Sequence, residues 1–346
     1  MAYIFGDGFD PYTATTDLIA GYWDGGTPAL INLVSGRFAG GRAIEWAATT
    51  STLTKASGQN DQLHHLTFAI RQTAAVSGTT LGHYFTLYET SAPQCSVVFR
   101  QDGAILLTGG SPGGAAIATY TGAVTAANTW FAFEIEVFVS NTAGYMNVRK
   151  NGSATNDFAS ATNLDTRGGS ASLWANKLTI GLQGVVSNHQ IDDLLWRSGA
   201  AGSVPWVGDL KCITRAPASD ASVAFARSSG ATNASCVDEA QQDALTTYVS
   251  DATPGNADFY NIGAAASVPA TTVAVTTRAY MAKSDAGART AAVQLKSGGT
   301  TVASPTLSLT TGFLWTWRTD TTNPATGTAW TAGGVDAVTV GPKTVA

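Results

Sequence analysis

This chain of 346 residues carries a formal net charge of −5, and 12% of its residues are charged whereas 44% are hydrophobic. A composition with so little charge excludes a disordered chain, and the length favours two domains over one. The 19 Lys and Arg residues are scattered, which excludes the basic stripe of a nucleic-acid-binding protein and the clustered charge of a membrane-surface helix. We therefore expect no nucleic-acid partner and no membrane insertion.

The first half of the chain shows period-two alternation of apolar and polar residues, which is typical of β-strands. The predicted strands are residues 65–72, 84–89, 96–100, 104–108, 130–139, 144–150, 177–182 and 190–197. Turn residues such as Asn151-Gly152 and the glycine-rich stretch 109–114 separate them. Short strands at intervals of about ten residues predict an all-β sandwich or barrel.

A looser segment at 198–205, rich in Gly, Ala and Ser, predicts the boundary between a domain at 1–198 and a domain at 205–346. Further strands are expected in the second half, at residues 206–214, 222–227, 246–250, 273–283, 290–297, 313–318 and 335–340. The stretch 237–245 is a candidate helix, or equally a loop with one helical turn.

The three cysteines, Cys95, Cys212 and Cys236, have no CxxC spacing, which argues against a zinc site. A Cys212–Cys236 disulfide stays open, although an odd number of cysteines favours free thiols. The N-terminus has no signal-peptide pattern, and no stretch is apolar for long enough to span a bilayer. We therefore expect synthesis in the cytoplasm.

Several segments together resemble a group of phage and prophage proteins. They are 5–12 (FGDGFDPY), 22–24 (YWD), 98–105 (VFRQDGAI), 129–137 (TWFAFEIEV), 148–152 (VRKNG), 191–194 (IDDL), 205–209 (PWVGD) and 323–331 (NPATGTAWT). Proteins of this group are described as structural or tail-associated components of virions. The resemblance implies a virion location after synthesis in a host cytoplasm, with other virion proteins and further copies of the chain as partners.

Residues 1–198 also resemble a concanavalin A-like, or laminin G-like, jelly roll. The stretch beginning at Trp130 is similar to the core strand of that fold, and Asn151-Gly152 suits the type I′ turn of the hairpin that follows it. The resemblance implies a concanavalin A-like jelly-roll sandwich, followed at 205–346 by a second, smaller β-sandwich for assembly or attachment. The segment through Trp23 is a candidate attachment arm.

Glu134 and Glu136 are the most enzyme-like feature of the sequence. Residues i and i+2 of a strand share a face and lie about 7 Å apart, and concanavalin-like glucanases carry catalytic carboxylates on such a strand. The spacing departs from that pattern because the central Asp and the third carboxylate are missing. A carboxylate on a solvated sheet face explains the pair without catalysis. No GxSxG motif or phosphate-binding loop is present, so we expect no catalytic residue and no enzyme.

Asp192 and Asp193 raise the alternative of a Ca²⁺ site, since oxygen ligands suit that ion. Strand alternation predicts that they point to opposite faces, where Asp192 could bind loop backbone instead. The histidines, His64, His65, His83 and His189, show no metal-binding spacing. We therefore expect no metal site and no cofactor, with structural roles for the histidines and His64 and His65 on opposite faces.

Trp315 and Trp317 stand out among the nine tryptophans because their i, i+2 spacing places them on one face. They are candidates for stacking on sugar rings, or for core and interface packing, which is more common for aromatic pairs.

The sequence observations lead to three hypotheses about function. The leading hypothesis is a non-enzymatic virion structural protein of a tail, fibre, baseplate or capsid decoration. The alternative is a carbohydrate-binding module that recognises a host-cell glycan, and the third is a glycoside hydrolase.

Overall fold

The computed structural model describes residues 3–47, 49, 51–184, 189–264 and 271–346. The chain divides into two compact units. Unit 1 comprises Met1–Asp10, Ala14–Ile19 and Trp23–Cys212, and unit 2 comprises Pro11–Thr13, Ala20–Tyr22 and Ile213–Ala346. The division after Cys212 lies beyond the predicted boundary at 198–205, because residues 205–212 are bound to the first unit by contacts described below.

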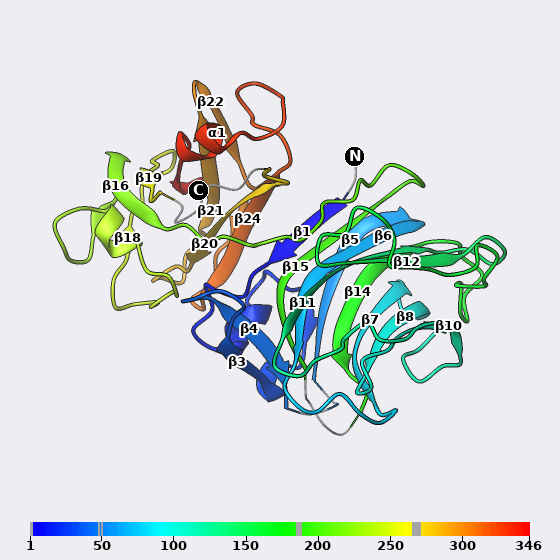
Figure 1. The fold of residues 1–346 in the computed structure, drawn as a ribbon. Helices are drawn as coiled ribbons and strands as arrows, with labels where there is room; N and C mark the ends of the chain where they lie inside the picture. The colour runs from blue at the N-terminus through cyan, green and yellow to red at the C-terminus, as the bar shows by residue number, and fades with distance from the viewer. Residues whose placement is uncertain (1–2, 48, 50, 185–188, 265–270) are drawn as a thin grey trace. The chain divides into compact units, whose positions relative to one another are not determined.

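Two antiparallel sheets make up unit 1 (Figure 1). The eight-stranded sheet has the order β13-β12-β11-β6-β15-β4-β3, and β1 also pairs with β15. Its strands are β1 (Tyr3–Asp7), β3 (Ile31–Ser35), β4 (Arg42–Trp46), β6 (Leu63–Gln72), β11 (Trp130–Phe138), β12 (Tyr145–Lys150), β13 (Phe158–Ala159) and β15 (His189–Gly199).

The seven-stranded sheet has the order β10-β9-β8-β7-β14-β5-β2. Its strands are β2 (Gly25–Gly26), β5 (Thr52–Asp61), β7 (Leu81–Glu89), β8 (Ala92–Arg100), β9 (Ile105–Gly109), β10 (Ala116–Tyr120) and β14 (Ala175–Leu182). The 3₁₀-helices η1 (Thr15–Ile19) and η2 (Pro28–Leu30) precede β3.

The core of unit 1 contains phenylalanines from both sheets. Phe68 of β6 stacks on Phe85 of β7 with ring centroids 4.4 Å apart, and Phe99 of β8 meets Phe133 of β11 edge-on at 5.7 Å. All four rings are buried, and each contributes about 1.5–3 kcal/mol through burial. The turn at Asn151-Gly152 has positive φ at both residues, 51° and 75°, as the predicted type I′ geometry requires.

Unit 2 is smaller and also consists of strands. Its six-stranded sheet has the order β16-β19-β25-β21-β22, with β23 paired to β21, and the pairs β17–β18 and β20–β24 form two further sheets. Its strands are β16 (Pro217–Ser222), β17 (Ala226–Arg227), β18 (Val249–Ser250), β19 (Phe259–Ile262), β20 (Val275–Met281), β21 (Thr290–Ser297), β22 (Thr300–Ala303), β23 (Leu307–Ser308), β24 (Leu314–Asp320) and β25 (Thr339–Thr344). Leu295, Trp330 and Val338 form a core cluster. The prediction of an all-β chain is confirmed.

The N-terminal segment, which is the candidate attachment arm, has buried aromatic side chains. Tyr12 and Tyr22 are fully buried within unit 2, where they meet Trp315 and Trp317 edge-on at 6.0 Å and 5.1 Å. Trp23 is fully buried in unit 1 and donates its Nε1–H to Asp7 at 2.9 Å. Burial of this many large aromatic groups fixes the segment in place.

Several predicted elements of the second half differ in the structure. The strand expected at 222–227 is split between the end of β16 and β17, and the strand expected at 246–250 is reduced to β18. Residues 206–214 form no strand, because the N–H groups of Val207 and Gly208 bind a carboxylate instead of a neighbouring strand. Residues 237–245 form no helix; a 3₁₀-helix, η3 (Ala234–Cys236), precedes them, and Ala244 has a φ of +55° that no α-helix permits. The strand expected from 335 starts at Thr339, since α1 (Ala332–Asp336) is capped by Thr331, which accepts from Gly334 N at 3.0 Å.

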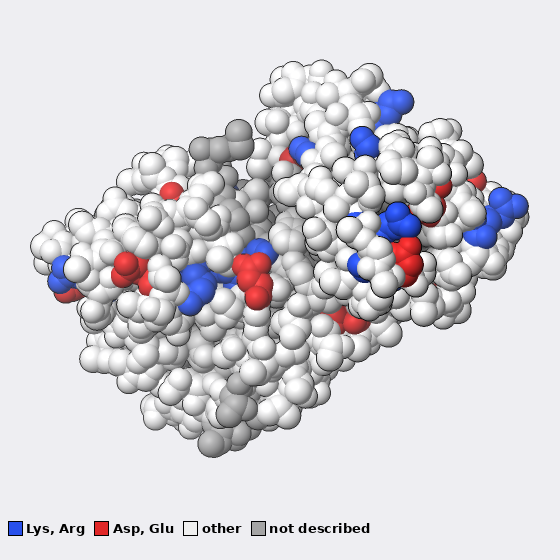
Figure 2. Space-filling view, turned by 180° about the vertical axis from the view of Figure 1, so that it is seen from behind, with Lys and Arg blue, Asp and Glu red and all other residues white. Residues whose placement is uncertain are grey.

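The described surface carries little charge. On the face drawn in Figure 2, acidic and basic side chains stand singly or in small groups on a mostly uncharged surface. Within the described residues, Cys95, Cys212 and Cys236 form no disulfide with one another. Among the helices of the described chain, none has the length and apolar character that crossing a bilayer requires.

Candidate functional site

The outer face of the eight-stranded sheet carries most of the polar side chains singled out in the sequence. On β11, Phe131, Phe133, Ile135 and Val137 point into the core and are buried. Trp130, Glu134 and Glu136 therefore point outward, because successive residues of a strand alternate between faces. Two groups of side chains occupy this outer face: a covered carboxylate network around Glu134 and an open row that starts at Trp130.

Glu134 is 2% exposed, so the expectation of a solvated carboxylate at this position is wrong. Its Oε1 accepts from Arg197 Nη2 at 2.8 Å and from Val207 N at 2.8 Å. Its Oε2 accepts from Gly208 N at 2.9 Å and from Val207 N at 3.0 Å. A buried carboxylate is stable when it is paired and hydrogen-bonded in this way.

Residues 205–212, which we name the covering segment, lie over this carboxylate. Arg197 Nη1 donates to Pro205 O at 2.6 Å, and the Trp206 ring lies 5.0 Å from His65 and 4.1 Å from the Arg149 guanidinium. Farther along, Arg37 donates from both terminal nitrogens to Asp209 at 2.6 Å. These contacts make the covering segment part of unit 1 and exclude water from Glu134.

Glu136 also lies in a network of partners. Its Oε2 accepts from His65 Nε2 at 2.9 Å, and its Oε1 accepts from Asn147 Nδ2 at 2.9 Å. Burial acts to raise the pKa of Glu136, but the hydrogen bonds from His65, Asn147 and Tyr145 outweigh it and lower this pKa. Burial, together with the nearby Glu136, raises the pKa of Tyr145 to about 12. At neutral pH Glu136 therefore holds no proton to donate.

Asp192 and Asp193 lie at a β-bulge, where the pairing of β15 with β6 shifts register between Asp192 and Leu195. Asp193 has a φ of +53°, so simple alternation fails and the prediction of opposite faces is wrong. Both carboxylates reach the loop at Arg37: its N–H donates to Asp192 Oδ2 at 2.6 Å, and its Nη1 lies 3.7 Å from Asp193 Oδ2. Asp192 therefore does bind loop backbone, as one alternative predicted.

These two carboxylates have shifted pKa values. Burial, with smaller contributions from neighbouring carboxylates, raises the pKa of Asp192 to about 6 and that of Asp193 to about 7. Asp193 Oδ1 accepts from Cys212 N at 2.7 Å, which fixes the end of the covering segment. Within the described residues, no cluster of three or more His, Cys, Asp or Glu side chains has an arrangement that could hold a metal ion.

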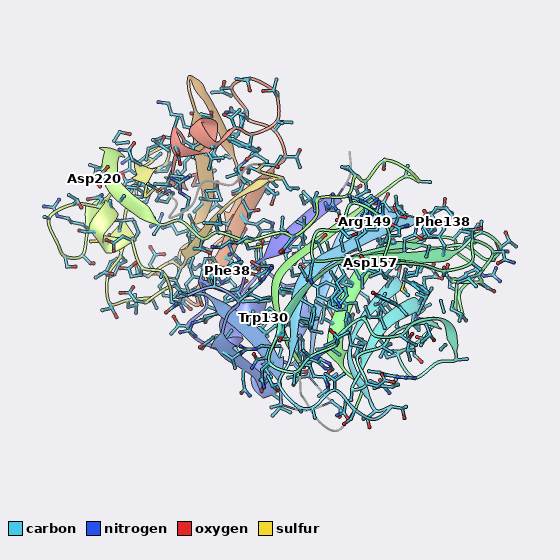
Figure 3. All side chains as sticks on the ribbon, in the orientation of Figure 1. Phe38, Trp130, Phe138, Arg149, Asp157 and Asp220 are labelled. Carbon is cyan, nitrogen blue, oxygen red and sulfur yellow. The ribbon has the colours of Figure 1, made fainter. Side chains whose placement is uncertain are left out.

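The second group on the outer face is a row of side chains across five adjacent strands. In the strand register, Trp130 lies directly opposite Arg71 and Arg71 opposite Gln190. Gln190 in turn lies opposite Glu45, and Glu45 opposite Asn32. We name these five residues the polar ladder. In Figure 3 Trp130 is labelled well apart from Arg149, which marks the covered end of the same sheet.

Four side chains of the polar ladder, from Trp130 to Glu45, contact one another in sequence. The Arg71 guanidinium lies 5.0 Å from the Trp130 ring and donates through Nε to Gln190 Oε1 at 2.9 Å. Gln190 Nε2 in turn donates to Glu45 Oε2 at 2.6 Å. Trp130, Arg71 and Glu45 are partly exposed and Asn32 is exposed. The ladder is thus a preorganised surface with an aromatic ring at one end and alternating donors and acceptors along it.

The two tryptophans predicted from the sequence lie elsewhere, on β24 of unit 2. Trp315 is 6% exposed, and its ring is tilted against Tyr280 at 4.7 Å as well as edge-on to Tyr12. Trp317 is partly exposed and packs against Tyr22. Arg278 lies over the Tyr22 ring at 4.4 Å in the same cluster. The pair therefore packs as part of an aromatic cluster.

The histidines are buried structural residues. His64 faces the core, where its Nδ1 accepts from Trp196 Nε1 at 3.3 Å and its Nε2 meets Asp61 O at 3.0 Å, whereas His65 faces outward to Glu136, as alternation predicts. Burial lowers the pKa of His64 and of His189 to about 4. Burial, with the neighbouring His189, also places the pKa of His83 well below its ordinary value.

No protein-family model and no curated protein matches the chain. Lectin UEA-II, solved in complex with galactose, is 11% identical with a TM-score of 0.36 over 57% of this chain and 98% of that one. Arcelin-5, a lectin-like defence protein from Phaseolus vulgaris, is 9% identical with a TM-score of 0.36 over the same shares. The binding domain of botulinum neurotoxin serotype D is 12% identical with a TM-score of 0.34, and the match covers 50% of this chain but only 44% of the toxin chain. Values this low assign the chain to none of these families.

The polar ladder was missed in the sequence because its members come from five separate segments. A weak signal is visible in hindsight: Glu45, Arg71 and Gln190 each lie next to a buried isoleucine, at Ile44, Ile70 and Ile191 respectively. A charged or amide residue beside a core isoleucine marks the solvent face of a strand. Only the strand order shows that the three lie side by side.

Proposed function

We propose that this chain is a non-enzymatic binding protein of a phage particle and that the polar ladder of unit 1 binds a neutral carbohydrate. The phage particle as its location follows from the sequence resemblance. The carbohydrate is supported by the ladder, whose aromatic ring, guanidinium and carboxylate are partly exposed on one face, with the buried Gln190 amide between the last two. This arrangement is the observation that carries the proposal.

The chemistry of the ladder suits a sugar ring. The apolar face of a pyranose stacks on an aromatic ring such as Trp130, while guanidinium, amide and carboxylate groups donate to and accept from its hydroxyls. Arg71 and Glu45 carry opposite charges in the same row, so the ladder favours a neutral ligand over an acidic or basic one. The side chains already hold one another in place, which reduces the entropy lost on binding.

The proposal of a non-enzymatic role is supported by the state of the two carboxylates. A glycosidase needs one carboxylic acid with a raised pKa and a partner about 5 Å away, or farther when a water attacks. Glu134 is closed off by the covering segment, and the pKa of Glu136 is lowered rather than raised. Neither residue is then available as a general acid.

A glycan array with the wild-type chain, Trp130→Ala and Trp174→Ala tests the ladder. Trp174 is also partly exposed but lies outside the ladder, which makes it the matched control. We expect binding of neutral glycans by the wild type and by Trp174→Ala, and loss of it in Trp130→Ala. Equal binding by all three chains would reject the ladder as the site.

A structural role in the particle, through association of copies, is favoured by a separate observation. Unit 2 exposes apolar side chains, with Leu245 at 73%, Val223 at 48% and Tyr248 at 39% exposure. Apolar side chains exposed to this degree could contribute to association if they are buried against a further copy of the chain. Light scattering of the purified chain, alone and mixed with particles that lack it, tests this role. A defined oligomer that rebinds particles is expected, and a monomer that ignores them would contradict it.

A further inference from the structure

Unit 2 has a pocket of about 230 Å³ on the outer face of its six-stranded sheet. It is lined by Ala221, Ser222, Phe259, Lys296, Gly298, Ala337 and Thr339. Lys296 and Thr339 are directly opposite each other on β21 and β25, and Ser222 is opposite Phe259 on β16 and β19. The neighbouring Leu295 points into the core, so Lys296 points outward by strand alternation.

Lys296 supplies the positive charge of this pocket. Its ammonium group lies 5.8 Å from the centre of the Phe259 ring, and among the described residues no carboxylate lies within ion-pair distance of it. The acidic residues next in sequence to the pocket lining are engaged elsewhere. Asp220 accepts from Asn233 N and Ala234 N at 3.1 Å and 2.7 Å. Asp258 accepts from Ala224 N and Phe225 N at 2.6 Å and 2.9 Å, and Asp336 pairs with Arg215 at 2.8 Å. The ammonium group is therefore available to an anion.

We propose that this pocket binds a single sugar ring that carries a carboxylate. The carboxylate contacts Lys296, the apolar face of the ring lies on Phe259, and the hydroxyls of Ser222 and Thr339 contact those of the sugar. The volume is below the roughly 300–1,000 Å³ of pockets for drug-sized ligands, which fits one ring rather than an oligosaccharide. This site uses none of the residues of the polar ladder, so it goes beyond the proposed function.

The test is an amide chemical-shift titration of the full-length chain with three probes. Methyl glucuronide is the acidic sugar, methyl glucoside is its neutral counterpart, and acetate is a plain anion. We expect saturable shifts at Gly298, Ala337 and Thr339 with methyl glucuronide, and much weaker binding of the other two. The proposal would be overturned if methyl glucuronide gave no saturable shift, or if methyl glucoside bound equally well. If acetate bound as tightly as the glucuronide, the pocket would be a general anion site and the proposal of a sugar ligand would be wrong.

Two Lys→Gln variants assign the site. Lys296→Gln removes the charge at an exposed position and should weaken glucuronide binding by about tenfold or more, the effect of one charge-assisted hydrogen bond. Lys343→Gln is the matched control, since Lys343 lies on β25 but does not line the pocket. Unchanged binding in Lys296→Gln, or loss of binding in Trp130→Ala instead, would show that the acidic sugar binds elsewhere.

Discussion

Glu134 of β11 and Arg197 of β15 form a buried ion pair at 2.8 Å, although β6 lies between their two strands. The side chains are 2% and 5% exposed. Glu134 also accepts from the backbone of the covering segment, and Arg197 donates to Pro205 O. The pair thus links the sheet to the segment that follows it, and a sequence pattern that resembled a catalytic motif has a structural role.

Glu134→Met should lower the free energy of unfolding of unit 1 by about 3–5 kcal/mol, because it leaves the Arg197 guanidinium buried without its counter-charge. The double variant Glu134→Met, Arg197→Met should regain much of this loss, since no buried charge remains. Urea denaturation measures both values. A single variant as stable as the wild type would show that the pair does not hold the segment.

Limited proteolysis provides a second readout of the same contact. In the wild type residues 205–212 are bound along their length, so cleavage there should be slow. Glu134→Met should speed it, whereas Glu136→Gln should not, because Glu136 has no contact with the covering segment among its described hydrogen bonds. Equal cleavage rates in both variants would contradict the role assigned to Glu134.

Acid should destabilise unit 1 through its buried histidines. Their pKa values are lowered by folding, so below about pH 6.5 the unfolded chain binds protons that the folded chain does not. His64 and His189, each with a folded pKa of about 4, should each remove about 3 kcal/mol of stability between pH 6.5 and pH 4. His189→Gln should reduce the slope of unfolding free energy against pH in this window, and an unchanged slope would contradict the burial of a neutral imidazole.

The aspartates at the bulge should act in the opposite direction. Their folded pKa values are raised, to about 6 for Asp192 and about 7 for Asp193, so the stability they contribute is present below about pH 4 and is lost as pH rises through 6 to 7. Asp193→Asn should therefore gain about 2–4 kcal/mol relative to the wild type between pH 4 and pH 8. Urea denaturation at both pH values measures this change, and a pH-independent difference would contradict it.

Trp315 should be a stability residue rather than a ligand contact. Trp315→Ala removes a buried indole that packs on Tyr12 and Tyr280, and it should destabilise unit 2 by about 3–5 kcal/mol. Trp317→Ala should destabilise unit 2 less than Trp315→Ala does, because Trp317 is partly exposed. Thermal unfolding tests stability. Glycan binding of the folded Trp317→Ala chain should equal that of the wild type, and its loss would restore the sugar-stacking interpretation.

Most long strands of the core could be predicted because large apolar residues alternate along them. The early strands β1, β3, β4 and β5 were not predicted, although Phe5, Ile44 and Leu53 are buried. The stretch predicted at 130–139 corresponds to β11, which ends at Phe138, and the prediction at 290–297 corresponds to β21. Short strands such as β2 and β13, with two residues each, give no periodicity to detect. Their formation depends on pairing with strands far away in sequence.

The candidate site could not be predicted because it too depends on pairing between strands that are far apart in sequence. The polar ladder needs the order β11-β6-β15-β4-β3 and a particular register in each pair, whereas sequence periodicity reports only the face on which each residue lies. At the bulge, even the alternation of side chains between the two faces of β15 fails, because the positive φ of Asp193 redirects its side chain. The covering segment alternates like a strand, yet its N–H groups bind Glu134.

The most direct test of the ladder is an amide chemical-shift titration of the wild type and Trp130→Ala with neutral methyl glycosides of glucose, galactose, mannose and N-acetylglucosamine. At least one glycoside should give saturable shifts at Arg71, Gln190 and Glu45 in the wild type. The same glycoside should bind about tenfold or more weakly to Trp130→Ala, which lacks the stacking ring. The absence of saturable shifts with all four glycosides, or equal affinity in Trp130→Ala, would contradict carbohydrate binding at this face.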